Sequence, residues 1–455
     1  MKKLALEEVV LLISIIKWTI LSIVTGIVVG LGAALFLIAL DGGIRLAAAK
    51  QYYFLLLPIA LFLSSFLIKW LAPEAEGHGT EKVIGAIHDD GGKINILVAP
   101  VKLITAIITI MFGGSAGKEG PCVQIGAGLA STLANVLKVN QEDYRKIVIC
   151  GVSAGFAAVF GTPIAGALFA VEVLVLGKIM HEMLFPTMVA AIVSFQTTKY
   201  CGVSYFYKQL YLVDGFQESL FLKVLLSGLF FGIVAIILVE VLSFCENGAK
   251  KIRIWAPLKG LLGGTLLILL VFLTSEDYLG LGTEVIEKAV HGETIFPAAF
   301  LLKIVFTSIT LSMGGSGGIL TPILFIGSTA GSAFAAICGY DPVMFAALGM
   351  VAVFAGANNT PLTGVIMFIE IFGPEASLYA VAACAVSYLI SGHRSVYPTQ
   401  LLGMTKSASL QLPLMADLGS LPKAQVCTGP GKLIFRIKKL GVFFKKIQEN
   451  FRQTF

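Results

Sequence analysis

Charge is what this 455-residue sequence has least of. Only 13% of its residues are Asp, Glu, Lys or Arg, whereas 57% are hydrophobic, and the mean hydropathy is +0.89. A soluble domain carries about 25% charged residues, and it needs them to cover its surface in water. The composition therefore excludes an ordinary soluble globular protein and predicts that lipid is the solvent for most of the chain.

Paired cysteines and catalytic signatures are also missing. The seven cysteines are scattered and never form a C-x-x-C pair, which argues against a disulfide framework, a zinc site or a redox motif. No H-E-x-x-H, G-x-S-x-G or P-loop sequence occurs. The few histidines are too dispersed to suggest a metal site. We therefore expect no enzyme, no bound metal and no other cofactor.

Long hydrophobic runs follow one another from about residue 10 to residue 390. Strands of a membrane barrel would alternate apolar and polar residues, and only helices or closed barrels satisfy their backbone in lipid. We therefore predict an all-α, polytopic integral membrane protein. The first charge-free run, Trp18 to Leu40, is too long for the apolar region of a signal peptide and is interpreted as a retained transmembrane helix.

Positive charge gathers at the two ends of the chain. Lys2 and Lys3 precede the first run, and residues 413–455 form a basic segment in which apolar residues alternate with cations. Its six central cations are Lys432, Arg436, Lys438, Lys439, Lys445 and Lys446. Such a run is typical of nucleic-acid binding, but in a membrane protein it favours a cytoplasmic amphipathic tail drawn to anionic headgroups. We predict cytoplasmic termini in the plasma membrane, and no nucleic-acid partner.

Three blocks rich in glycine and proline occur twice, in the same order. Gly77–Glu81 recurs as Gly280–Glu284, Gly113–Pro121 as Gly314–Pro322, and Thr162–Gly166 as Thr360–Gly364. Chance similarity between apolar runs does not preserve both order and spacing. We infer two repeats, at about 70–180 and 275–375. Repeats with broken helices are the architecture of transporters, in which the binding site lies where the halves meet.

The block Gly113–Pro121 interrupts an apolar stretch. Its four glycines and one serine do not hold a helix well, while Pro121 suits the first turn of a new helix. N–H groups left unpaired at such a start cost several kcal/mol each in lipid, and an anion is their natural acceptor. We therefore expect helix starts from both repeats to converge on an anion site that needs no full positive charge.

Glu119 stands in the middle of this break. A carboxylate inside the bilayer is costly and indicates function by default. Among amides arranged for an anion, it would occupy the site when charged and leave when protonated, so that one residue is both gate and proton carrier. The alternative is an ion pair with Lys118 at the membrane surface, although adjacent residues of a helix face different directions.

These motifs resemble those of the CLC family of chloride channels and chloride/proton antiporters. Residues 117–121 (Gly-Lys-Glu-Gly-Pro) are similar to the signature G-[KR]-E-G-P, whose glutamate is the external gate. Residues 318–322 are similar to G-x-F-x-P, and residues 77–81 to G-S-G-I-P. Tyr397, near the start of a late helix, falls where the family's anion-coordinating tyrosine stands. The resemblance covers about residues 15–412.

The resemblance implies the CLC fold: two inverted repeats with broken, re-entrant helices, in a homodimer with one pathway per subunit. It also implies site residues. The central anion site would be lined by His78, Gly79, Ile319, Leu320 and Tyr397, and the external site by Lys118, Gly120 and Thr321, with Glu119 as gate. No long soluble region follows Tyr397, so the paired cytoplasmic nucleotide-binding (CBS) domains are absent and the chain looks like the compact prokaryotic type.

The sequence departs from the family pattern at the residues expected to select the anion. His78 replaces the family serine, Thr80-Glu81 replaces Ile-Pro, and Leu320 replaces phenylalanine. A histidine is a larger donor that titrates near neutral pH. His78 therefore either sets selectivity or pH dependence, or merely lines the path. Chloride is the expected anion, with nitrate and fluoride left open.

Val173 stands where antiporters of the family often carry an internal proton-transfer glutamate, and Glu172 precedes it. Glu172 has a repeat counterpart in Glu370, which favours a structural role such as accepting helix N–H groups. Proton coupling then needs another route. We predict a chloride/proton antiporter, with a passive anion channel as the alternative and a membrane-embedded enzyme or scaffold as a distant third.

Overall fold

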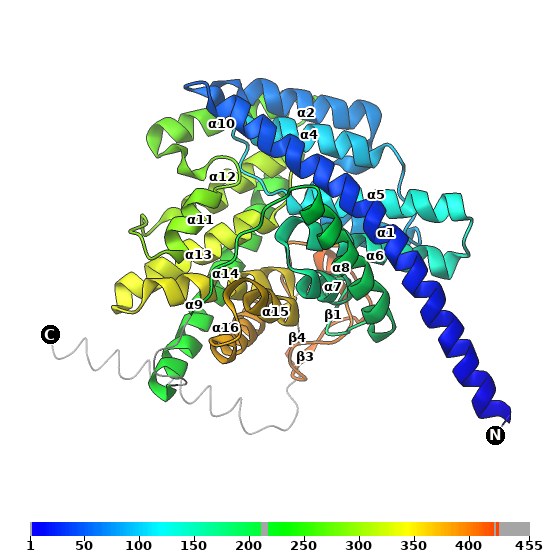
Figure 1. The fold of residues 1–455 in the computed structure, drawn as a ribbon. Coiled ribbons are helices and arrows are strands. Elements are labelled where there is room, and N and C mark those ends of the chain that lie inside the picture. The colour runs from blue at the N-terminus through cyan, green and yellow to red at the C-terminus, as the bar shows by residue number, and fades with distance from the viewer. Residues whose placement is uncertain (1, 211–216, 423–424, 427–455) are drawn as a thin grey trace.

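The described part of the chain folds into two halves with eight α-helices each, in matching order. The computed structural model describes residues 2–210, 217–422 and 425–426 (Figure 1). The first half contains α1 (Lys2–Ala48), α2 (Leu57–Leu71), α3 (Thr80–Asp89), α4 (Val98–Met111), α5 (Glu119–Leu137), α6 (Gln141–Phe160), α7 (Pro163–Glu172) and α8 (Leu184–Tyr200). The second contains α9 (Glu218–Lys251), α10 (Ala256–Leu273), α11 (Thr283–Val290), α12 (Ala299–Ser312), α13 (Leu320–Cys338), α14 (Pro342–Asn358), α15 (Pro361–Phe372) and α16 (Ser377–Ile390).

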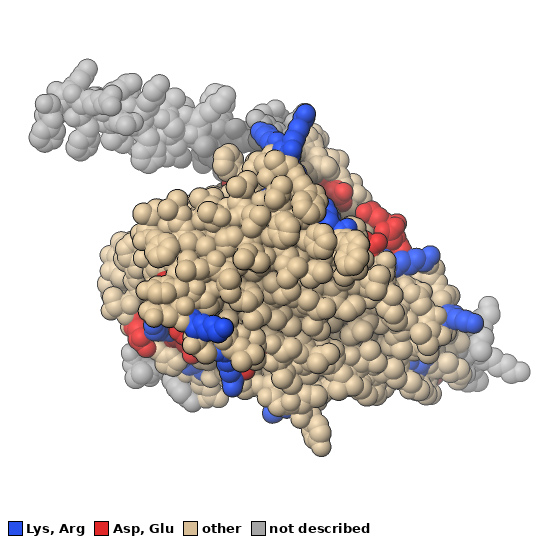
Figure 2. Space-filling view, turned by 90° about the horizontal axis from the view of Figure 1, so that it is seen from above, with Lys and Arg blue, Asp and Glu red and all other residues tan. Residues whose placement is uncertain are grey.

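Within the described ranges, five helical segments are long and apolar enough to cross a membrane. They are residues 7–48, 53–71, 218–251, 256–273 and 320–338. Figure 2 shows a broad face without charge, bounded at two opposite sides by Lys, Arg, Asp and Glu side chains. A hydrocarbon core of about 30 Å requires about 20 apolar residues. The protein is therefore a multi-pass membrane protein, and its shorter helices stop within the fold.

The two halves meet through a reciprocal backbone contact between equivalent glycines. Gly117 N donates to Gly318 O and Gly318 N donates to Gly117 O, both at 2.7 Å, in an antiparallel bridge. Because each residue is the other's counterpart in the repeat, a local twofold axis passes between them. The helices that follow, α5 and α13, run apart in opposite directions (Figure 1). The inverted-repeat fold is thus confirmed.

Glycine is required at this meeting point because backbones touch there. A Cβ atom on Gly120 would lie 2.0 Å from His78 O, and one on Gly318 would lie 2.5 Å from Gly120 N. Contacts below 3.0 Å with backbone atoms leave no room for a side chain, so any other residue would force the helix starts apart.

Glu172, on α7, and Glu370, on α15, each cap the start of the helix that carries the other. Glu370 Oε1 and Oε2 accept hydrogen bonds from Ile164 N at 2.9 Å and Ala165 N at 2.8 Å, at the start of α7. Glu172 accepts from Leu362 N at 3.0 Å and from Thr363 N at 2.8 Å, at the start of α15. The expected structural role of these glutamates, accepting helix N–H groups, is confirmed.

One sequence-based expectation needs correction. Tyr397 does not lie near the start of a late helix: after α16 the chain runs irregularly through residues 391–400. The irregular backbone suits Pro398, which lacks an N–H, and β2 (Leu401–Leu402) then pairs in parallel with β1 (Val175–Leu176).

The predicted all-α fold class is confirmed: beside its helices, the described chain adds a second two-residue ladder between β3 (Leu410–Gln411) and β4 (Gln425–Val426). The basic cluster between Lys432 and Lys446 lies outside the described residues. The assignment of residues 413–455 as a cytoplasmic tail therefore stays a prediction.

The reciprocal caps make a testable contribution to stability. Replacing Glu172 or Glu370 with alanine removes charge-assisted hydrogen bonds from amides at a helix start, which should lower the free energy of unfolding by about 1.5–3 kcal/mol per site. Thermal unfolding of the detergent-solubilised protein measures this effect. Glu142→Ala, which removes an exposed ion pair with Lys146, serves as control and should change stability by less than about 1 kcal/mol. Equal midpoints for all three variants would contradict the capping role.

Candidate anion pathway

Three helix starts meet at the centre of the molecule. α3 begins at Thr80, α5 at Glu119 and α13 at Leu320, and none of the three is capped by the side chain of the residue that precedes it. A Cβ atom on Gly79 would lie 2.5 Å from Gly120 O, which shows how closely the first two starts approach. The amino ends of helices carry partial positive charge. Their convergence creates a site suited to an anion.

Glu119 occupies one of these helix starts. Its side chain is fully buried and accepts hydrogen bonds from Thr321 N, at 3.0 Å, and from the Thr321 hydroxyl. The carboxylate thus sits on the amino end of α13, where an external anion would bind. Within the described chain no ion pair joins Glu119 to Lys118, so the surface ion pair considered from sequence is not what holds this carboxylate.

A cavity of about 120 Å³ adjoins Glu119 and is called here the gate cavity. Its lining includes Lys118, Glu119, Tyr205, Thr283, Thr321 and Leu324. The cavity gives the carboxylate somewhere to move if it leaves the start of α13. The ammonium group of Lys118 contributes a positive charge to the lining, which would attract anions.

Three buried polar atoms on the inner side of the gate lack ordinary hydrogen bonds. They are His78 Nδ1, Thr80 Oγ1 and the Tyr397 hydroxyl, and none has a partner of normal geometry among the described residues. Thr80 and Tyr397 lie beside one another, and Tyr397 is within electrostatic reach of Glu119. Buried polar groups are normally satisfied. The hydroxyls of Thr80 and Tyr397 therefore fit a small anion beside them, whereas His78 Nδ1 faces Glu81.

The structure brings the sequence-predicted residues to this region. Gly79 precedes α3, Lys118 and Gly120 flank the gate, and Ile319, Leu320 and Thr321 lie at the start of α13. All of them are buried except Lys118, which is half-buried. Their binding of an anion stays a prediction. Thr80 was not expected as a donor, although a hydroxyl directly after Gly79 at a helix start is a readable signal.

Tyr397 is positioned by cross-links rather than by a helix. Val396 N donates to Ala357 O at 3.0 Å, and Asn359 Nδ2 donates to Arg394 O at 2.9 Å. Gln400 Nε2 donates to Val173 O at 2.7 Å. These bonds tie the irregular segment to the ends of α14 and α7, which fixes the Tyr397 ring in the core.

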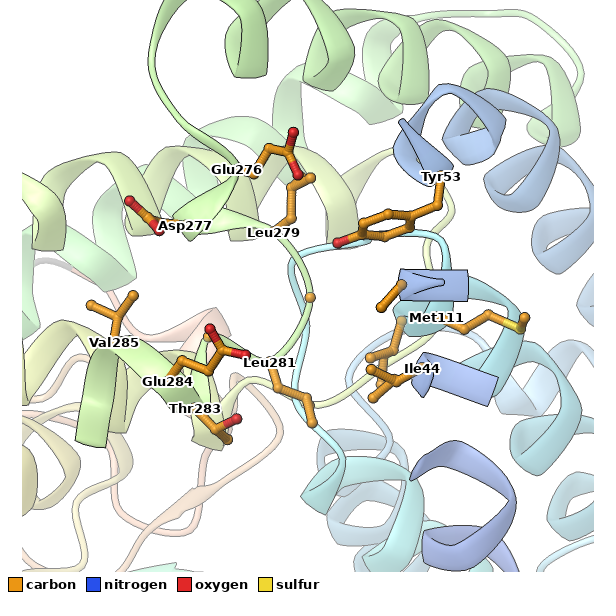
Figure 3. Close-up of a pocket in the computed structure, with 14 residues that line it drawn as sticks. Ile44, Tyr53, Met111, Glu276, Asp277, Leu279, Leu281, Thr283, Glu284 and Val285 are labelled. Carbon is orange, nitrogen blue, oxygen red and sulfur yellow. The ribbon is translucent and has the colours of Figure 1, made fainter. Parts of the chain in front are cut away.

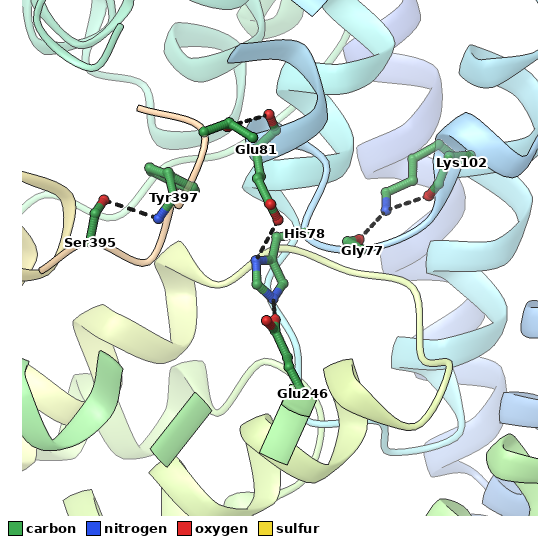
Figure 4. A network of polar contacts seen from close by, with 9 residues as sticks. Gly77, His78, Glu81, Lys102, Glu246, Ser395 and Tyr397 are labelled. Atoms are coloured by element: carbon green, nitrogen blue, oxygen red, sulfur yellow. Dashed lines mark hydrogen bonds and ion pairs between the residues drawn. The ribbon is translucent and has the colours of Figure 1, made fainter. Parts of the chain in front are cut away.

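His78 belongs to a polar network that sequence reasoning only partly found (Figure 4). Its Nε2 lies 3.1 Å from Glu246 Oε1, on α9, and its Nδ1 lies 3.8 Å from Glu81 Oε2. Lys102 Nζ donates to Gly77 O at 2.7 Å and so fixes the backbone that carries the histidine. No sequence motif predicts a role for Glu246, because it is one of several polar residues near the end of a long apolar helix.

Lys102 has a repeat counterpart in Lys303. The Lys303 ammonium is fully buried and donates to Tyr278 O at 3.1 Å and to Gly280 O at 3.0 Å. Both lysines therefore hold the turn that precedes the third helix of their own half. The signal for this pair was present in the sequence as a lone cation at the same place in two apolar runs.

A larger cavity, of about 270 Å³, lies beside the turn that Lys303 holds (Figure 3). Glu276, Asp277 and Glu284 are among its lining residues, together with Tyr53. Three carboxylates repel an anion, so this cavity is unsuited to the anion path. The start of α11 shares the sequence Gly-x-Gly-Thr-Glu with its repeat counterpart, α3, and differs in carrying Leu281 where α3 has His78.

Comparison with known proteins places the chain in a family. The family model for voltage gated chloride channels matches residues 59–392. The chain is 35% identical over 407 residues to the chloride/fluoride channel protein of Pseudomonas syringae pv. tomato, covering 88% of this chain and 90% of that protein. It is 28% identical over 357 residues to the H(+)/Cl(-) exchange transporter ClcA of Klebsiella pneumoniae, covering 71% of this chain and 74% of that protein.

The fold agrees with this relationship. The structure matches the crystal structure of a CLC-type fluoride/proton antiporter with a TM-score of 0.81, at 32% identity, covering 84% of this chain and 97% of that one. Matching motifs, matching sequence over most of the chain and a matching fold lead to one conclusion: this protein belongs to the CLC family of voltage-gated chloride channels and related transporters.

Proposed function

We propose that this protein is an anion/proton antiporter in which Glu119 is both the gate and the proton carrier. Anion transport follows from membership of the family. The position of Glu119 is the observation that supports coupling to protons. Its buried carboxylate accepts two hydrogen bonds from Thr321 at the start of α13. A carboxylate at this helix start occupies the position that the transported anion would otherwise take.

The exchange follows from competition for one site. A charged Glu119 blocks the start of α13, so the anion enters only when the carboxylate leaves. Protonation removes the negative charge that the helix start attracts, and the neutral side chain moves towards the gate cavity. Anion and proton therefore take turns. The amides of Lys118, Gly120 and Thr321 would hold the anion outside, and His78, Gly79, Ile319, Leu320 and Tyr397 would hold it within.

The assembly and orientation are part of the same proposal. We place the protein in the plasma membrane with both termini in the cytoplasm, as the basic ends of the chain favour. It would act as a homodimer with one pathway in each subunit. The exposed apolar side chains of Ile164, on α7, and Leu362, on α15, are 43% and 49% accessible and suit burial against a second copy. Neither a metal nor another cofactor takes part.

The passive anion channel remains the second candidate because of Val173. This side chain is fully buried and cannot carry a proton, so a protein without another internal route would move anions alone.

Fluoride is the anion that we infer to be preferred over chloride. Two relatives above 30% identity are named as a chloride/fluoride channel protein and a fluoride/proton antiporter. The pathway here is lined by hydroxyl groups from Thr80, Thr321 and Tyr397, and the donors that line a pore determine which ion replaces its water there. A small, charge-dense anion gains most from such donors. The expectation of chloride stays open to the test below.

Replacing Glu119 tests the antiport. In proteoliposomes with an outward anion gradient, the wild type should drive protons inward against their own gradient, as recorded by an external pH electrode. Glu119→Ala should keep moving anions and lose proton movement, because the carrier is gone. Glu287→Gln is the matched control: it removes another carboxylate that lines the gate cavity and should leave coupling intact. Anion flux without proton movement in the wild type would instead establish a passive channel.

Selectivity is tested by parallel fluoride and chloride gradients. Wild-type liposomes should release fluoride at least about tenfold faster than chloride, which corresponds to about 1.4 kcal/mol of discrimination. Ion-selective electrodes record both fluxes. Protein-free liposomes, measured with each anion at the same pH, correct for leakage of neutral acid. Equal rates, or faster chloride, would contradict the preference for fluoride without affecting the proposal of antiport.

A further inference from the structure

The pair formed by His78 and Glu246 is the starting point. The His78 side chain is 2% exposed, and its Nε2 lies 3.1 Å from Glu246 Oε1. Figure 4 shows the imidazole ring between Glu246 on one side and Glu81 on the other. A titratable ring held against a carboxylate at hydrogen-bond distance can receive and return a proton.

Glu246 lies at the end of α9 that is remote from the segment lining the gate cavity. It stands near the end of α9, a helix of 34 residues that is about 50 Å long. The segment before α9 contributes Ser204, Tyr205 and Phe206 to the gate cavity. Glu246 follows the first residue of α9 by some 40 Å of helix, so it belongs to the opposite face of the membrane domain.

A cavity of about 220 Å³ leads to Glu246 on that opposite face, and it is called here the tail cavity. Its lining includes Glu240, Ser243, Glu246, His393, Arg394 and Pro398. The Glu246 side chain is 27% exposed, so it contacts solvent and His78 at the same time. The pair therefore connects water on this face with a buried ring.

The inner end of the pair adjoins the gate. The carbonyl of His78 packs so closely on Gly120 that a Cβ atom there would lie 2.0 Å away. Gly120 directly follows Glu119. The other ring nitrogen, Nδ1, is buried and makes no hydrogen bond within the described ranges. The backbone of His78 thus adjoins the gate, while its ring lies between Glu246, at the tail cavity, and Glu81.

We propose that Glu246 and His78 form the internal proton relay of this transporter, in place of a glutamate at Val173. The proposal rests on the proposed antiport and names the route by which protons reach the inner side of the gate. Val173 is apolar and fully buried, so the usual position offers no carrier.

The relay consists of three proton transfers. The Glu246 carboxylate takes a proton from water in the tail cavity, forming an O–H bond, and gives it to Nε2 of His78, which becomes an imidazolium. The ring then releases its Nδ1 proton towards Glu119 through the space that the departing anion has left, and Glu246 is again a carboxylate. Tautomer exchange then moves the remaining ring proton of His78 from Nε2 back to Nδ1, so that the relay can start again. Proton and anion thus occupy this space in turn and never together, as antiport requires.

The surroundings of the pair are mixed in charge. Glu246 is influenced by Lys82, on α3, and by Lys250, on its own helix. His78 also faces Glu81. Glu240 pairs with Arg394 through a 2.6 Å contact at the rim of the tail cavity. Because Glu240 shares the helix and the cavity but points to Arg394, it is a matched control for Glu246.

The test is simultaneous recording of proton and anion flux by the full-length protein in liposomes, driven by a chloride or fluoride gradient. Glu246→Gln should reduce the number of protons moved per anion roughly tenfold or more. Glu246→Asp should restore part of the ratio because it returns an ionisable oxygen, which a merely structural clamp would not do. Glu240→Gln should give the wild-type ratio.

A wild-type ratio in Glu246→Gln would overturn the relay and leave the antiport standing. Proton movement absent from the wild type itself would overturn the antiport and the relay together. If Glu246→Gln does not yield folded protein, His78→Gln removes the other member of the pair, and an unchanged ratio in that variant would equally overturn the relay.

Discussion

Every other feature of the pathway depends on the two backbone hydrogen bonds between Gly117 and Gly318. They bring the starts of α5 and α13 together inside the membrane domain, where buried amides must find an acceptor. Because the two glycines are repeat equivalents, the contact also defines the twofold relation between the halves. The anion site is therefore a consequence of how the repeats join, and the absence of side chains at the glycines allows the approach.

The same chemistry appears at three places with different outcomes. A glutamate from one half binds the amino end of a helix from the other half at Glu119, Glu172 and Glu370. Glu172 and Glu370 are each held by two amides at starts that also contain a proline, and they fasten the halves together. Glu119 has a cavity beside it. Free volume beside such a carboxylate decides whether it can leave the helix start and act as a gate, or stays bound and only stabilises the contact between the halves.

The features that depend on adjacent residues could be predicted from the sequence, and those that depend on contacts between distant segments could not. Glycine and proline marked the breaks, so the starts of α3, α5 and α13 and the repeat could be derived from the residues alone. Tyr397 was expected near a helix, but its position depends on bonds from Val396, Asn359 and Gln400 to distant segments. Glu246 precedes Lys250 and Lys251 and resembles a surface charge in the sequence. Only the packing of α9 against the turn before α3 brings it to His78.

The twofold relation holds in the backbone and is broken in the side chains. The counterpart of Glu119 in the second half is Leu320, which is fully buried, and the counterpart of His78 is Leu281. Two equal halves facing opposite ways would give a molecule with no difference between its two ends. The leucines remove the ionisable groups from one half alone. The two ends of a duplicated scaffold thereby differ in their ionisable groups, although the two halves share one backbone arrangement.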